Sequence, residues 1–114
     1  MTEVEEFPKF PSEELDSFEL DNGEELHAEF PATFWIPERA RRERAEPGEI
    51  VKLIFRIFLA SGEVEVERMW VIVKRRVGGF YLGVLDNDPY CTEELKAGRE
   101  LYFGPEHIIN FDDP

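Results

Sequence analysis

The most constraining feature of the sequence is an alternation of apolar side chains with a period of two along residues 51–59. One set of alternate positions is entirely apolar, and the other set mixes charged and apolar residues. A period of two predicts a β-strand with one face turned to a core. The apolar set is Val51, Leu53, Phe55, Ile57 and Leu59.

Residues 64–76 predict a second strand after a turn at Ser61-Gly62. In its first half we expect the valines to face inward and the glutamates outward. The alternation changes phase near Arg68, because residues 69–73 form a continuous apolar run. A bulge near Arg68 and burial of the strand on both faces would each explain this change. The valines are Val64 and Val66, and the glutamates are Glu65 and Glu67.

The remaining sequence predicts further short strands in meander order. Gly78-Gly79 is typical of a hairpin turn before a strand over 80–85, and Gly83 inside that strand indicates a bulge or a close backbone approach. We expect a loop at 86–89 and one helical turn at 93–96. Two last strands are expected at 100–103 and 107–111. Five short strands in this order favour a strongly bent antiparallel sheet or a partial β-barrel.

The first third of the chain differs in composition from the rest. The 114 residues carry 26 acidic and 13 basic side chains, a net charge of -13. Residues 1–34 hold 11 of the acids and one lysine, so this segment carries -10 and residues 35–114 only -3. Ser12 is a suitable N-cap for a helix at 13–15, and a second helix could cover 24–30. The sequence therefore predicts one α+β domain over 1–114, with an acidic, partly helical segment (1–34) before a β-rich part (35–114).

Charge and composition also restrict the classes of partner. A strongly negative field repels nucleic acids and anionic membranes and favours a basic protein partner. A single cysteine excludes an internal disulfide, and no signal peptide or apolar run of 18 residues is visible. We expect a cytoplasmic protein without a cofactor; the sequence leaves the oligomeric state open.

Asp86-Asn87-Asp88-Pro89 is the most conspicuous polar cluster. Two carboxylates and an amide could bind a hard cation or supply a general base. The same residues are typical of a turn, because Asn tolerates left-handed backbone, Asp caps nearby amides and proline keeps the preceding residue extended. The residues that follow lack the ligands of a calcium loop, so the turn is the favoured interpretation and no metal site is predicted.

Arg68 and Trp70 mark the place where we expect any ligand site. A buried Arg68 paired with Glu67 or Asp86 could form a polar pocket with Trp70 as its apolar wall, and His107 could contribute. The structural alternative places Trp70 in the core and Arg68 toward solvent or against the loop. The candidate binding residues are thus Arg68, Trp70, Asp86, Asn87, Asp88 and His107, and no catalytic residue is predicted.

Other reactive or charged residues have plain alternatives. Cys91 could act as a nucleophile with His107 as its base, but a lone cysteine is usually a small packing residue. His27 and His107 show no metal-ligand spacing. Four arginines within six positions could form a nucleic-acid patch, neutralise the acidic first third, or form a solvated surface. They are Arg39, Arg41, Arg42 and Arg44.

Several short motifs resemble a bacterial family when taken in order. They are Val51–Phe55, Glu67-Arg68-Met69-Trp70-Val71, Gly83–Pro89, Lys96–Glu100 and Glu106–Ile109. The third motif contains the sequence Leu85-Asp86-Asn87-Asp88-Pro89. Over roughly residues 33–111 the chain resembles the YegJ-like domain, which is number 2314 in the series of domains of unknown function. The resemblance implies a small α+β domain and brings no catalytic residues, and the acidic first 32 residues have no counterpart in it.

Two functions are compatible with these observations. The first is a non-enzymatic protein-interaction module, of an immunity or regulatory type, whose acidic surface binds a basic partner. The alternative is a small-molecule-binding domain or minor enzyme with its site between Arg68, Trp70 and the 86–89 loop.

Overall fold

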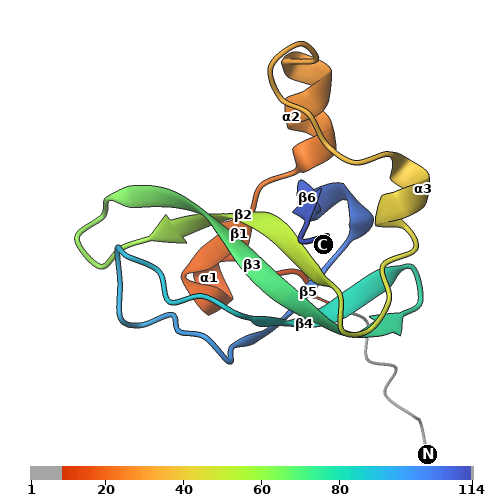
Figure 1. Cartoon of the computed structure of the whole chain (residues 1–114). Helices are drawn as coiled ribbons and strands as arrows, with labels where there is room; N and C mark the ends of the chain where they lie inside the picture. The colour runs from red at the N-terminus through yellow and green to blue at the C-terminus, as the bar shows by residue number, and fades with distance from the viewer. Residues whose placement is uncertain (1–8, 114) are drawn as a thin grey trace, which may run out of the picture.

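The computed structural model describes residues 9–113 as a curled antiparallel sheet with short helices around it (Figure 1). The elements are α1 (Glu13–Asp16), β1 (Phe18–Leu20), α2 (Gly23–Glu29), α3 (Arg39–Arg42), β2 (Ile50–Phe58), β3 (Val64–Val77), β4 (Phe80–Leu85), β5 (Glu100–Phe103), the 3₁₀ turn η1 (Pro105–His107) and β6 (Asn110–Phe111). The predicted α+β class and bent antiparallel sheet are confirmed.

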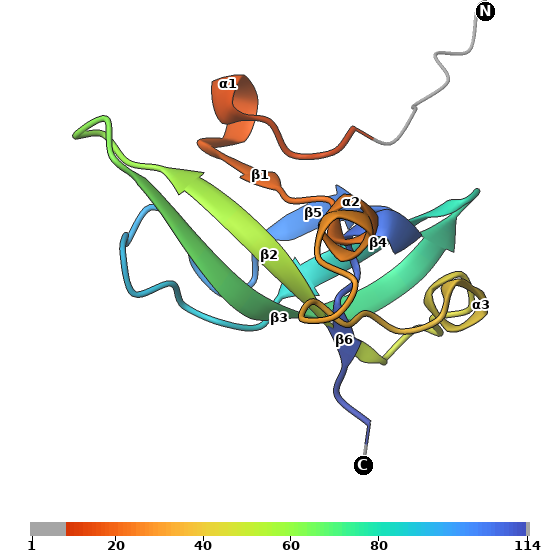
Figure 2. The same cartoon turned by 90° about the horizontal axis from the view of Figure 1, so that it is seen from above.

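Five strands follow one another across the sheet in chain order, from β1 to β5. The sixth, β6, pairs with the beginning of β2, on the same edge where β1 pairs with its end. The sheet curls into a half-barrel, and the hairpin that joins β2 to β3 projects beyond it (Figures 1 and 2).

The core lies inside this curl and is built by the alternation that the sequence displays. Odd-numbered residues of β2 and β3 point inward together, where they meet aromatic side chains from the neighbouring strands. Burial of these side chains from water supplies the main driving force for the sheet to curl. The fully buried set includes Phe18, Val51, Leu53, Phe55, Val71, Val73, Tyr81, Leu85, Phe103 and Ile108.

The predicted facing of the first half of β3 is wrong. β2 and β3 pair without interruption from Ile50↔Ile72 to Phe58↔Val64, so there is no bulge near Arg68. Val64 and Val66 are 46% and 48% exposed, because this part of the hairpin extends past the core. Their glutamate neighbours lie on the face that carries Met69 further along the strand.

The irregularity of β3 lies further along, between Val73 and Arg75, in its pairing with β4. Gly83 is paired with Val73 at this point. A Cβ atom on Gly83 would lie 2.6 Å from Val71 Cγ1 and 2.7 Å from Phe103 Cε1. The close approach predicted for this glycine is therefore confirmed, and it lets β4 pack tightly where the register shifts.

The acidic first third, as far as the structure describes it, is part of the domain. The short strand β1, which the sequence pattern does not predict, adds to β2 and buries Phe18 in the core. Three carboxylates of the acidic segment pair with arginines from the rest of the chain. The pairs are Asp16–Arg99 at 2.7 Å, Asp21–Arg56 at 2.9 Å and Glu24–Arg42 at 3.0 Å.

Both predicted N-terminal helices are confirmed, together with the predicted Ser12 cap; Asn22 caps the second helix, and this cap was not predicted. Ser12 Oγ accepts a hydrogen bond from the Leu15 N–H, and Asn22 Oδ1 accepts one from the Glu25 N–H. These side chains satisfy amides that the first turn of a helix leaves unpaired.

Two other expected elements are corrected. Residues 93–96 form no helix, because the Thr92 hydroxyl and the Asp88 carboxylate take the nearby amides of Glu94 and Ala97. His107 lies in a 3₁₀ turn and not in a strand, since its Nδ1 accepts the Gly104 N–H, and the last strand begins only at residue 110.

Candidate functional site

The 86–89 loop is fastened to β3 through Trp70. Asn87 Oδ1 accepts the Trp70 N–H at 2.6 Å, and the Asp86 N–H donates to the Trp70 carbonyl at 2.9 Å. Asp88 Oδ1 accepts the Ala97 N–H at 2.9 Å, which ties the loop to the approach of β5. Two of its three polar side chains thus satisfy backbone amides, as the turn interpretation expects.

Arg68 and Trp70 lie on the outer face of β3, where Lys52 of β2 joins them. Lys52 Nζ lies 4.5 Å from the centre of the Trp70 ring, and Arg68 Cζ lies 5.5 Å from the centre of the Phe34 ring. Cations over aromatic faces attract the negative face of the ring. Within residues 9–113, neither Lys52 nor Arg68 forms an ion pair.

A shallow hollow of about 190 Å³ opens between these groups, and we call it the aromatic–cation hollow. Trp35 at its rim is 69% exposed, and it comes from the segment between α2 and α3. The lining residues are Thr33, Phe34, Trp35, Lys52, Arg68, Ile109 and Asn110. The hollow is smaller than the roughly 300–1,000 Å³ of typical small-molecule pockets, so it suits a protruding side chain of a protein better than a whole ligand.

The predicted site residues therefore separate into three places. Arg68 borders the aromatic–cation hollow, and Trp70 with Asn87 lies beside it on the same strand. Asp88 lines a different hollow of about 280 Å³, next to Pro89 and Lys96. Trp35 and Lys52 were not among the predicted residues, and the sequence carries no signal that Trp35 is exposed.

His107 lies apart from these residues, in the 3₁₀ turn η1. Its ring is buried, stands edge-on to the Phe10 ring at 4.8 Å, and accepts the Gly104 N–H at Nδ1. Burial lowers the pKa of His107, against the opposing charges of Glu106 and Glu24. A neutral histidine that accepts a backbone hydrogen bond here holds a turn together.

Cys91 is not prepared for nucleophilic chemistry. Burial and the neighbouring Glu67 carboxylate raise the pKa of its thiol to about 11. The Glu67 carboxylate also accepts the N–H groups of Tyr90 and Cys91. Because the thiolate is the reactive form, a thiol with this pKa is a poor nucleophile at neutral pH.

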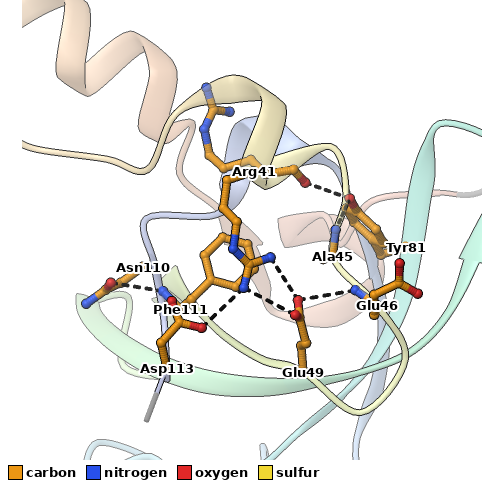
Figure 3. Close-up of polar contacts among 9 residues, drawn as sticks. Arg41, Ala45, Glu46, Glu49, Tyr81, Asn110, Phe111 and Asp113 are labelled. Atoms are coloured by element: carbon orange, nitrogen blue, oxygen red, sulfur yellow. Dashed lines mark hydrogen bonds and ion pairs between the residues drawn. The ribbon is translucent and has the colours of Figure 1, made fainter.

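Three of the four clustered arginines form ion pairs with carboxylates of the same chain. Arg41 donates to Glu49 at 3.0 Å and to Asp113 at 3.2 Å, and its guanidinium lies 3.7 Å from the centre of the Phe111 ring (Figure 3). These contacts hold β6 and the two residues after it against the residue that precedes β2. Arg39 pairs with Glu43 at 2.6 Å on the surface of α3.

Arg42 is the most deeply buried charge in the described chain. It is 4% exposed, and its guanidinium donates to the carbonyls of Pro37 and Pro105 and pairs with Glu24. Its own carbonyl accepts the Tyr81 hydroxyl at 2.6 Å. Arg42 thus links α2, α3 and η1, and the interpretation of this cluster as partial neutralisation of the acidic segment is supported at this position.

Residues 9–113 contain no group of three histidine, cysteine or acidic side chains arranged to hold a metal ion. No helix in the same range is long and apolar enough to cross a membrane.

Comparisons of the chain with protein-family models, with curated proteins and with solved structures find no match. The resemblance to the YegJ-like domain stays a prediction, and the function must be argued from the surface of this chain.

Proposed function

We propose that this protein is a non-enzymatic, cytoplasmic interaction module of an immunity or regulatory type, and that its acidic surface binds a basic protein. We also propose its membership of the YegJ-like family. The observation that carries the binding proposal is the balance of charge in residues 9–34. Eight acidic side chains lie in this range, and only three of them are paired with arginines of the described chain.

The remaining carboxylates are placed for an outside partner. Four of them are exposed on the two N-terminal helices, and none forms an ion pair within residues 9–113. A group of exposed carboxylates raises the rate at which the protein associates with a positively charged surface. They are Glu13, Glu14, Glu25 and Glu29.

An apolar contact point lies among these charges. Leu15 of α1 is 74% exposed, and it borders a hollow of about 260 Å³ together with Phe58 and Glu94. Protein interfaces combine a small apolar centre with a charged rim, and this region has both.

The small-molecule alternative has weaker support. Arg68 and Asp88 line separate hollows, so the pocket that the alternative needs would have to form on binding. Cys91, the one nucleophile considered for an enzymatic role, has a thiol whose pKa is raised to about 11.

The test uses two variants with equal changes of charge. One replaces the four exposed helix glutamates by lysine, and the matched control replaces four exposed acids elsewhere in the chain: E38K, E46K, D86K and D112K. Partners are captured from extracts of the source organism, identified by mass spectrometry and purified. Affinity is then titrated between about 0.1 M and 1 M salt, over which the Debye length falls from about 10 Å to about 3 Å.

We expect affinity to fall steeply with salt, and the helix variant to lose far more affinity than the control variant. Affinity that is indifferent to salt would refute the acidic-surface proposal. Equal losses in the two variants would show that net charge alone matters and not the surface of the N-terminal helices.

A further inference from the structure

Successive residues of β3 direct their backbone N–H and C=O groups alternately to the two sides of the strand. Val73 donates to the Glu49 carbonyl and accepts the Gly48 N–H, so odd-numbered residues form bonds on the β2 side. Trp70 forms both of its backbone bonds with the 86–87 segment, on the opposite side. Even-numbered residues of β3 therefore direct their N–H and C=O groups away from β2.

This opposite side has no strand partner along the first half of β3. β4 pairs with β3 only from Val71 to Val77, and the loop contacts stop at Trp70. The N–H and C=O groups of Val64, Val66 and Arg68 consequently face outward without a partner strand in residues 9–113. An open row of this kind is a template for pairing with another chain.

The side chains along this edge are also exposed. Val64 and Val66 are about half exposed on one face, and Glu65 is exposed on the other. The tip of the hairpin projects beyond the half-barrel (Figure 2). The segment after β4 comes near the other end of this edge, where the Glu67 carboxylate accepts the Tyr90 and Cys91 N–H groups. The most open part of the edge is therefore at Val64 and Val66. In strand addition, backbone hydrogen bonds give affinity and alternate side chains give specificity.

Charge decides which strand fits. In a symmetric antiparallel pair of two copies centred on Val66, Glu65 of one copy would lie opposite Glu67 of the other, and each copy carries -13. Like charges in opposed positions destabilise a strand pair. A strand that places a basic residue opposite Glu65 and an apolar residue opposite Val66 is favoured on both faces.

We infer that the free edge of β3, Val64–Arg68, binds an extended segment with alternating basic and apolar residues, which adds to the sheet as an antiparallel strand. This inference rests on the proposed function, because it names the way in which a basic partner is held.

The test uses a defined probe, the terminally blocked heptapeptide Lys-Val-Lys-Val-Lys-Val-Lys. Its matched control carries N-methyl groups on the three valines, whose N–H groups would face β3, and has the same charge and sequence. Binding of both to the full chain is measured by calorimetry at low salt, and amide signals are followed by NMR. We expect the signals of Val64, Val66 and Arg68 to shift, and the N-methylated peptide to bind about tenfold more weakly or worse, since two or more hydrogen bonds are lost.

The protein variant V66P removes the central outward N–H and leaves the ladder to β2 intact, which an edge strand tolerates. V66P should bind both peptides equally weakly, whereas V66T, which keeps the N–H and a β-branched side chain, should bind like the wild-type protein. If V66P does not fold, the difference in affinity between the two peptides for the wild-type chain still tests strand addition.

The outcomes separate the two proposals. Equal binding of both peptides to the wild-type chain would overturn strand addition and leave the acidic-surface proposal standing. No binding of either peptide at low salt would overturn both. A peptide-free dimer in ultracentrifugation that V66P abolishes would overturn the inference in favour of a second copy at the edge.

Discussion

Replacement of the buried Arg42 by methionine should destabilise the fold far more than replacement of any exposed charged residue. Methionine keeps much of the buried volume but removes the charge and all the donors. The carbonyls of Pro37 and Pro105 and the Glu24 carboxylate would each lose a partner that lies 2.8 to 3.0 Å away.

The magnitude follows from these contacts. Two hydrogen bonds from a charged donor to buried carbonyls are worth about 1.5 to 3 kcal/mol each. Removal of one partner from a fully buried ion pair costs about 3 to 5 kcal/mol. Because the Glu24 side chain is 35% exposed, the lost ion pair adds little to the lost carbonyl bonds, and we expect a total within this range. For a domain of this size we expect Tm to fall by about 12 to 20 °C, with about 4 °C for each kcal/mol.

Urea and thermal unfolding followed by circular dichroism measure this loss, and two variants serve as controls. R39M, three positions earlier on α3, breaks an exposed pair and should leave both midpoints nearly unchanged. E24Q should cost clearly less than R42M, because the carbonyl bonds of Arg42 remain. If R42M unfolds with the same midpoints as R39M, the argument that Arg42 links three elements is refuted.

Three further outcomes are expected. G83A should destabilise the protein by about 1 to 3 kcal/mol in urea unfolding, because the added methyl overlaps two buried side chains. Stability should fall as pH drops below about 6.5, the ordinary pKa of histidine. Because the pKa of His107 is lowered in the folded protein, the unfolded chain binds the proton more readily and is favoured at low pH. Protonation of Nδ1 also removes the acceptor of the Gly104 N–H. Cys91 should react slowly with iodoacetamide at pH 8, since its pKa is about 11, and E67Q should speed the reaction by removing the nearby charge.

Each of these outcomes has its own control. G79A places a methyl in open space and should be neutral in the same unfolding assay, so equal losses in both glycine variants would contradict the packing argument. H107N, whose amide oxygen can accept the same hydrogen bond and does not titrate, should flatten the loss of stability below about pH 6.5, and an unchanged pH profile in H107N would contradict the role given to His107. A wild-type thiol that alkylates as fast as free cysteine would contradict the account of Cys91.

The sheet was predictable because its central strands are long and periodic. Hydrophobic alternation predicted β2, β3 and β4 nearly to the residue, and it fails only where β3 runs past the core. There Val64 and Val66 have nothing to face, so their hydrophobicity does not decide the direction in which they point. β1 was missed because three residues are too short to show a period.

The surroundings of the candidate site depended on contacts between distant residues. Asn87 was recognisable as a turn residue, but its bond to Trp70 requires the β3–β4 register. The burial of Arg42 could not be foreseen, because three other arginines lie within three positions of it and only tertiary packing distinguishes them. The open edge of β3 became visible only once the end of β4 pairing was known.

The division of the β2 edge between β1 and β6 has a consequence for synthesis of the chain. The strands β2 to β5 are joined by successive neighbours and can pair as soon as each has left the ribosome. The beginning of β2 must wait for residues 110 and 111, some sixty positions later, before its outer edge is covered. A nascent chain in which residues 110 and 111 are still inside the ribosome therefore holds β2 to β5 with an uncovered edge at the start of β2, and the emergence of β6 sets the moment at which that edge is covered.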